Sequence, residues 1–99
     1  MLVHSVFFYL KPDLAPEDIA TFEAKAMALS KIPQVAHGWL GKPAPTGNRP
    51  VIDTTYSYGF TVVFKSIADH DSYQVDPIHL DFLKHCAKFW TTVKIYDAE

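Results

Sequence analysis

Residues 56–65, YSYGFTVVFK, alternate between two faces more clearly than any other stretch of the chain. Aromatic and β-branched side chains dominate the stretch, and a period of two is typical of a strand. One face carries large side chains throughout, which are those of Tyr56, Tyr58, Phe60, Val62 and Phe64. The other face carries Ser57, Gly59, Thr61 and Val63. The stretch therefore predicts a strand that packs its first face on a core.

The segments around this strand indicate which sheet it belongs to. Further strands are expected over residues 2–10, 35–42 and 90–97, which are rich in β-branched and aromatic residues. A helix is expected over residues 16–31, and a helix broken in two follows Ser66. A four-stranded antiparallel sheet with helices on one face satisfies this order. The fold class predicted is therefore α+β, a ferredoxin-like sandwich.

The first predicted helix begins at Pro16, where the missing N–H of proline costs nothing. Apolar side chains then recur at spacings of three and four, which are those of Ile19, Phe22, Ala26 and Leu29. That spacing predicts a single buried stripe. After the second strand, residues 43–54, PAPTGNRPVIDT, form a loop that is long enough to border a site.

Residues 72–79, SYQVDPIH, contain the break in the second helical region. Asp76 is a good N-cap and Pro77 a good first helical residue, so a new helix begins here. Tyr73 precedes His79 by six residues, and in one unbroken helix their side chains would point about 240° apart. The break permits the two side chains to converge. The inward stripe of the new helix is expected to hold His79, Phe82, Leu83 and Cys86.

Apolar side chains on the second face of the predicted sheet indicate a partner subunit. The chain has 99 residues, 48% of them hydrophobic, which suits a single domain over residues 1–99. Helices on one face leave the other uncovered, although apolar side chains lie there too, namely Val3, Phe7, Tyr9 and Val63. An identical subunit is the simplest cover for such a face, so we expect a homodimer.

Composition argues against several classes of partner. The net charge is −2 and the nine basic residues are scattered, so nucleic-acid binding is not expected. No segment approaches the ~20 apolar residues of a transmembrane helix, so no membrane partner is expected. The apolar start lacks a basic leader and a cleavage site, and it is interpreted as a strand. Cys86 is the only cysteine, which fits a reducing cytoplasm.

Five short motifs occur in an order and spacing that match a known family. They are HSVFFYLK (4–11), IPQV with a following glycine (32–38), FTVVFKS (60–66), YQVDPIH (73–79) and IYD (95–97). With these motifs the chain resembles the stress-responsive dimeric α/β-barrel (Dabb) domains over nearly its full length. The resemblance implies ferredoxin-like subunits whose sheets pair into a β-barrel at a homodimer interface. Members include plant stress proteins and a plant polyketide cyclase branch.

The resemblance to the cyclase branch implies roles for single residues. That branch closes a ring by aldol condensation without metal or organic cofactor, and its proposed tyrosine and histidine fall on Tyr73 and His79. A histidine on its first strand matches His4. Another pocket histidine is replaced by Tyr58, and a histidine before the proline is replaced by Asp76. The polar centre is kept in part, but the lining differs, so the same substrate is not expected.

The residues themselves indicate a pocket between sheet and helices for a small, largely apolar molecule. A helix N-terminus and apolar surroundings both favour neutral imidazole at His79, which is the form of a general base. Tyr73 would donate a hydrogen bond to an oxyanion, and His4 would orient the substrate. Tyr58 and the strand-end Asp97 would add polar contacts. The expected walls are Phe8, Phe22, Phe60, Phe82 and Trp90.

Other interpretations stay open at this stage. His4, Tyr73 and His79 could all be structural, in a non-enzymatic stress or assembly protein, or could serve a cofactor-free monooxygenase. By residue type, His4, His79 and Asp97 could bind a metal, but no pair has the spacing of a zinc helix motif. No metal and no cofactor is therefore expected. The remaining histidines are expected at the surface, namely His37, His70 and His85.

Overall fold

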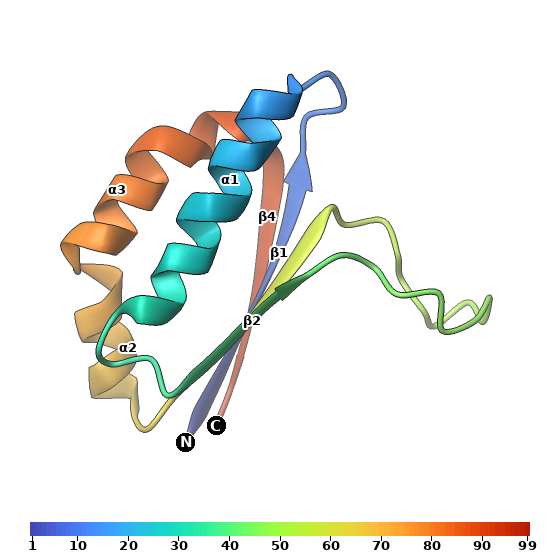
Figure 1. Cartoon of the computed structure of the whole chain (residues 1–99). Coiled ribbons are helices and arrows are strands. Elements are labelled where there is room, and N and C mark those ends of the chain that lie inside the picture. Colours follow the sequence, from blue (N-terminus) through green and yellow to red (C-terminus); the bar gives the residue numbers. More distant parts are fainter.

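The computed structural model describes residues 1–99 and contains one four-stranded sheet with helices on one of its faces (Figure 1). The elements are β1 (Leu2–Leu10), α1 (Pro16–Ala28), β2 (His37–Gly41), β3 (Tyr58–Phe64), α2 (Ile67–Gln74), α3 (Pro77–Cys86) and β4 (Trp90–Ala98). Short 3₁₀ turns at Leu29–Lys31 and Ala87–Phe89 prolong α1 and α3. The strand order is β2-β3-β1-β4, and all neighbours are antiparallel. The predicted ferredoxin-like sandwich is confirmed.

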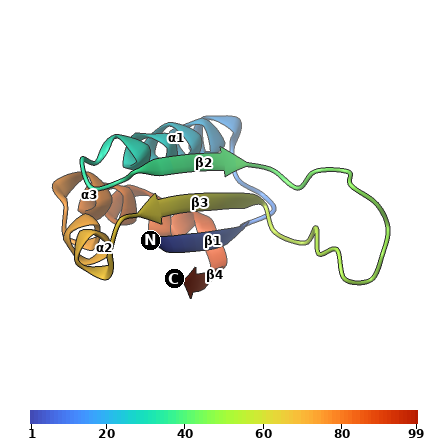
Figure 2. The ribbon, with the colours of Figure 1, turned by 90° about the horizontal axis from the view of Figure 1, so that it is seen from below.

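β1 lies inside the sheet and directs alternate side chains to two different environments. Its register pairs His4 with Val62 of β3 and with Asp97 of β4. His4, Val6 and Phe8 are buried on the face that the helices cover. Val3, on the opposite face, keeps 38% of its surface exposed. We call this opposite side the open face of the sheet, because no element of the chain covers it (Figure 2).

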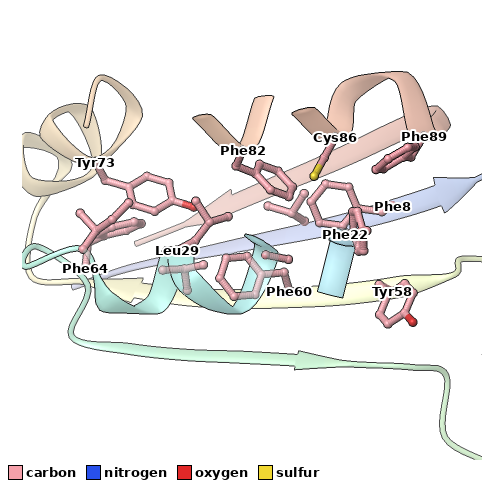
Figure 3. Packing of buried hydrophobic residues seen from close by; sticks show 14 of the residues in the cluster. Phe8, Phe22, Leu29, Tyr58, Phe60, Phe64, Tyr73, Phe82, Cys86 and Phe89 are labelled. Carbon is pink, nitrogen blue, oxygen red and sulfur yellow. The ribbon is translucent and has the colours of Figure 1, made fainter. Parts of the chain in front are cut away.

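The core between sheet and helices is built mainly from aromatic rings (Figure 3). Phe22 of α1 is fully buried, and its ring lies 5.1 Å from that of Phe8 and 5.9 Å from that of Phe82. These tilted and edge-on contacts are the arrangement that aromatic pairs prefer. The rings therefore fix the distance at which α1 and α3 pack on the strands.

Side-chain caps start both of the short helices that follow β3. The Ser66 hydroxyl accepts a hydrogen bond from the Asp69 N–H at 3.2 Å, and the Asp76 carboxylate accepts one from the Ile78 N–H at 2.8 Å. The predicted break before Pro77 is confirmed. The predicted inward stripe holds for His79, Phe82 and Cys86, which are buried. Leu83 also faces a cavity between helices and sheet, but it stays 39% exposed and is not part of the buried stripe.

The strands β2 and β3 are shorter than predicted, and a long connection joins them. At the start of β3, the Leu10 N–H donates to the Ser57 hydroxyl at 2.8 Å and not to a main-chain carbonyl, so the regular ladder begins at Tyr58. Most of this connection extends away from the sheet and helices (Figures 1 and 2), but at its end the Tyr56 ring packs 5.0 Å from that of Phe7 on the open face. No helix in the structure combines the length and the apolar character needed to cross a membrane.

Candidate functional site

A cavity of about 140 Å³ lies between the sheet and the helices α2 and α3. We call it the helix-side cavity. Predicted site residues that line it are His4, Phe8, Phe60, Tyr73, His79, Phe82 and Trp90. Most of the lining is apolar, and the polar side chains come from β1 and from the two helices on either side of the Asp76 break. The cavity thus has the composition of a small-molecule site, an apolar wall with a few convergent polar groups.

Tyr73 is the centre of the polar group. Its ring centroid lies 4.8 Å from that of His79 and 6.3 Å from that of His4, and both contacts are edge-on. The break at Asp76 therefore does bring Tyr73 and His79 together. The Tyr73 ring contacts both histidines and so joins His4 of β1 to His79 of α3.

His79 occupies the third position of α3, is 8% exposed, and its Nδ1 has no hydrogen-bond partner in the chain. Burial lowers the pKa of His79 below its ordinary value of 6.5, and the nearby His4 and His70 act in the same direction. The Gln74 backbone and the Asp76 carboxylate oppose the shift. The net effect favours neutral imidazole at pH 7, which is the protonation state of a base.

Tyr73 is held as a neutral phenol. Its side chain is 2% exposed, and burial raises the pKa of Tyr73 well above its ordinary value of 10. Burial is the only cause of this shift, because no hydrogen bond from the chain stabilises either form of the hydroxyl. Figure 3 shows the ring reaching from α2 into the layer between the helices and the sheet. A neutral hydroxyl at this place is a free hydrogen-bond donor.

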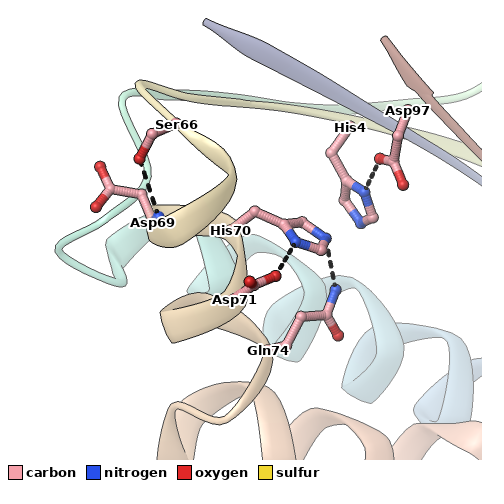
Figure 4. Close-up of polar contacts among 7 residues, drawn as sticks. All are labelled: His4, Ser66, Asp69, His70, Asp71, Gln74 and Asp97. Carbon is pink, nitrogen blue, oxygen red and sulfur yellow. Dashed lines mark hydrogen bonds and ion pairs between the residues drawn. The ribbon is translucent and has the colours of Figure 1, made fainter. Parts of the chain in front are cut away.

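His4 is joined to Asp97 across the sheet. Its Nδ1 lies 2.5 Å from Oδ1 of Asp97, as the register of β1 with β4 requires (Figure 4). Asp97 was expected to contact the substrate, but it does not line the helix-side cavity, and its side chain is 42% exposed at the edge of the sheet. Asp97 instead fixes the ring of His4, which does line the cavity.

The prediction that His70 is a surface residue is wrong. Its side chain is only 18% exposed, and its ring lies 5.0 Å from that of His4 in an edge-on contact. Figure 4 shows the His70 ring extending from α2 toward His4. The helical spacing from Tyr73 to His70 places both side chains on the sheet-facing side of α2, and this signal in the sequence could have identified His70.

The sequence profile of the stress responsive A/B barrel domain matches residues 2–99. The chain belongs to the Dabb family. A comparison with curated proteins gives no match. The resemblance seen in the short motifs is therefore confirmed over nearly the whole chain.

Solved structures share the fold of this Dabb domain. A Dabb family protein of Mesorhizobium loti is 25% identical, with a TM-score of 0.78 and coverage of 99% of this chain and 94% of that one. A hydroxynitrile lyase of Passiflora edulis is 20% identical, with a TM-score of 0.79 and coverage of 98% and 90%. A dimeric ferredoxin-like protein of Thermobifida fusca is 14% identical, with a TM-score of 0.78 and coverage of 98% and 88%.

Two other predicted site residues of the Dabb domain lie away from the polar group. Tyr58 does not line the helix-side cavity, and its hydroxyl donates to the Glu23 carboxylate of α1 at 2.5 Å. Burial, followed by this hydrogen bond, raises the pKa of Tyr58 to about 12. Phe22 does not line the cavity either, because it is fully buried between Phe8, Tyr58 and Phe82.

Sequence reasoning predicted Trp90 as the wall that β4 contributes but missed two further side chains of this strand. Val93 and Ile95 line the helix-side cavity and remain 37% and 50% exposed. Their register with β1 places them on the same side of the sheet as His4. They remain partly exposed because β4 is the edge strand and the helices do not cover it fully. Their alternation with Thr92 and Lys94 was the available signal. A ligand can approach the polar group over this edge.

The arrangement can hold a neutral base and a neutral hydrogen-bond donor beside one apolar space. Such a pair suits substrates with one or two carbonyl or hydroxyl groups on an apolar body, because a charged group would find no partner in the lining. A purely apolar ligand would leave the His79 Nδ1 and the Tyr73 hydroxyl without hydrogen-bond partners.

Proposed function

We propose that this Dabb domain binds a small, largely apolar carbonyl compound in the helix-side cavity and catalyses proton transfer there. One observation carries the proposal: Tyr73 and His79, both buried and both with unused hydrogen-bond capacity, contact each other at the wall of an otherwise apolar cavity. Unsatisfied buried polar groups destabilise a fold. A bound polar group would complete the hydrogen bonding of the pair and so offset this destabilisation.

The proposed chemistry begins with removal of a proton α to the carbonyl. The proton moves to the neutral imidazole of His79, and the electron pair of the C–H bond shifts to the carbonyl oxygen. Tyr73 donates its hydroxyl hydrogen bond to that oxygen, where negative charge develops. The enolate then forms a new carbon–carbon bond to a second carbonyl carbon, whose π electron pair moves to its oxygen, and that oxygen takes the proton from the His79 imidazolium. Alternatively the enolate carbon takes the proton back. His4, fixed by Asp97, is the polar group that orients the substrate.

The depressed pKa of His79 and the raised pKa of Tyr73 suit these two roles at neutral pH. A positioned base typically accelerates proton transfer by 10²–10⁴-fold. The fold is also compatible with chemistry at a carbonyl group, since a hydroxynitrile, the adduct of a carbonyl compound with hydrogen cyanide, is the substrate named for the lyase of the same fold. At 20% identity that similarity concerns the fold, and the residues of this chain carry the argument.

The test uses deuterium exchange into the methyl group of acetophenone, an aryl ketone with an exchangeable α proton. Wild-type protein in D₂O should accelerate exchange, as followed by proton NMR. Replacing His79 with alanine should lower the rate by about 10²–10⁴-fold, and Tyr73→Phe should lower it because the oxyanion loses its donor. His85→Ala is the matched control, because His85 is an exposed histidine on the same helix.

Exchange that continues unchanged in both His79→Ala and Tyr73→Phe would contradict the catalytic role. Saturable binding of acetophenone without exchange would instead support a binding or stress-response protein that is not an enzyme. Consumption of oxygen with an aromatic substrate would support the monooxygenase alternative.

We also propose that the domain works as a homodimer joined through the open face. Large side chains remain exposed there, including Trp39 at 60% and Tyr96 at 62%. The Thermobifida fusca protein of the same fold is described as dimeric, which supports the proposal. Pairing two open faces would cover these side chains and leave the helix-side cavity accessible, because the cavity lies on the opposite side of the sheet.

A further inference from the structure

One cluster of possible metal ligands lies at the end of the sheet where β1 meets β4. His4, His70 and Asp97 each offer one ligand atom, and these atoms all lie within 4.8 Å of one another. Two of the three come from paired strands, since His4 and Asp97 are register partners, and the third comes from α2 (Figure 4). We propose that this cluster binds one divalent transition-metal ion of the zinc type.

The spacing of the ligand atoms is close to what zinc requires. Zinc binds histidine nitrogen and carboxylate oxygen at about 2.0–2.2 Å, so ligand atoms around a tetrahedral ion lie roughly 3.3 Å apart. In this structure the Nδ1 of His4 and the Oδ1 of Asp97 are 2.5 Å apart, and a proton on Nδ1 would bond the carboxylate. An ion that replaces this proton needs only a small separation of the two atoms and a small approach by the third ligand.

The side chains that must move are the ones that are free to move. His4 is 3% exposed and is fixed in the core. Asp97 is 42% exposed on an edge strand, and His70 is 18% exposed on a helix. The cluster therefore has one rigid ligand and two adjustable ones, and the partly exposed Asp97 leaves a route of entry for the ion.

His70 already has the tautomer that a ligand needs. Its Nδ1 lies 3.1 Å from the Asp71 carboxylate, and its Nε2 lies 3.1 Å from the Gln74 amide nitrogen. The carboxylate can only accept and the amide nitrogen can only donate, so Nδ1 carries the proton and Nε2 presents its lone pair. A carboxylate behind a histidine is the arrangement that orients metal-binding imidazoles in proteins. An ion would take the place of the Gln74 amide at Nε2.

The donor set selects the class of ion. Two imidazoles and one carboxylate suit zinc and its neighbours among the divalent transition metals better than magnesium or calcium, which prefer oxygen. Three protein ligands leave a fourth position open for water. Because His4 also lines the helix-side cavity, the bound ion would lie at the margin of that cavity.

This site goes beyond the proposed function, although the two share His4 and Asp97, because an ion would replace the hydrogen bond that fixes His4. The test below measures metal binding and not proton exchange, so either proposal can fail without the other. The site also departs from the prediction that no metal binds; the possible ligand set considered there contained His79 where the structure has His70. The spacing along the chain gave no signal, since residues 4, 70 and 97 come together only through the fold.

Isothermal titration of the metal-free full chain with Zn²⁺ tests the proposal. We expect one ion per chain, and we expect His70→Ala and Asp97→Asn each to weaken binding by more than the 10–100-fold that loss of an outer-shell partner causes. Asp71→Asn should weaken it by about 10-fold. His85→Ala is the matched control, because His85 and Asp81 form a histidine–carboxylate pair with no third ligand, and its affinity should equal that of wild type.

Substitution with Co²⁺ gives a second readout that does not depend on affinity. The wild-type protein should develop the visible absorption of tetrahedral Co²⁺, and His70→Ala should lose it while keeping the circular dichroism of the folded chain. Zn²⁺ affinity that is the same in wild type, His70→Ala and Asp97→Asn would overturn the proposal. So would less than one ion per chain at saturation.

Discussion

His79 combines two properties that rarely coincide on one side chain, burial and an unused ring nitrogen. It stands at the N-terminal turn of α3, where the partial positive charge of the helix disfavours a second positive charge. The Tyr73 ring covers it on one side. These surroundings favour the neutral imidazole, so the protonation of His79 should contribute to the pH dependence of the site.

We predict that α-proton exchange is constant at and above pH 7 and declines in acid. The decline should have an apparent pKa below the ordinary histidine value of 6.5, because burial lowers the pKa of His79. Measuring kcat/KM between pH 4 and pH 8 (roughly the range that histidine titrates) checks this. A decline centred above 6.5 would contradict a buried, neutral base.

The same shift predicts how stability depends on pH. A histidine whose pKa is depressed in the folded state binds more protons when unfolded, so its contribution is fully present above 6.5 and is lost as the pH falls through the folded value. The free energy of unfolding of wild type, measured with urea, should therefore fall as the pH falls below 6.5. His79→Gln should show a smaller loss over the same range, and an equal loss would assign the effect to other groups.

Phe22 provides a test of the aromatic core. Phe22→Ala should reduce the free energy of unfolding by about 3–5 kcal/mol, because it leaves a cavity between three packed rings. Met27→Ala on the same helix is the control, since Met27 is 61% exposed, and it should change stability by less than about 0.5 kcal/mol. Similar urea midpoints for the two variants would contradict this description of the core.

At the scale of elements, the break between α2 and α3 is the feature that assembles the site. α2 ends at Gln74 and Asp76 caps α3, so Tyr73 and His79 come from two separate helices. The cap serves both stability and the position of His79, which follows it by three residues.

We predict that Asp76→Ala costs about 1 kcal/mol of stability, the usual effect of losing an N-cap, and also slows exchange because the start of α3 loosens. Ser66→Ala removes the equivalent cap of α2, so it is the matched control. It should cost a similar amount in urea unfolding but leave exchange closer to the wild-type rate. Equal exchange rates in the two variants would show that the Asp76 cap has no special role at the site.

Local patterns predicted the elements well, because alternation and helical spacing depend only on neighbours in the chain. The stretch 56–65 and the Asp76–Pro77 break are examples. Contacts between distant elements were harder to predict. Tyr58 bonds Glu23 of α1, and His70 lies against His4 of β1, and neither contact follows from the periodicity of one segment. The location of the helix-side cavity was therefore predicted from the sequence. Which side chains form its polar group became clear only from the folded structure.

At the scale of the whole molecule, the two faces of the sheet differ in what covers them. The helices bury one face and leave the helix-side cavity, and the open face keeps large side chains exposed. Most of residues 42–57 extend beyond both layers (Figure 2). A second copy of the chain on the open face would remove most of this exposed apolar surface from water.

We predict that light scattering at micromolar concentration gives the mass of a dimer. A stable interface should bury at least ~1,200 Å² in total. Introducing a charge at the open face, as in Trp39→Lys, should shift the protein toward monomer, because the lysine would have to be desolvated at the interface. Met27→Lys on the helix side is the control and should remain dimeric. A wild-type protein of monomer mass would contradict the proposed assembly.

The central claim is that the ligand binds between the sheet and the helices, and the two tryptophans of the chain test it directly. Trp90 lines the helix-side cavity, and Trp39 lies exposed on the open face. Titrating ¹⁵N-labelled protein with acetophenone, and following the two indole N–H signals by NMR, separates the two faces in one experiment. We expect a saturable shift of the Trp90 signal while the Trp39 signal stays in place. A Trp39 shift alone, or no shift of Trp90 at saturating ketone, would contradict the claim.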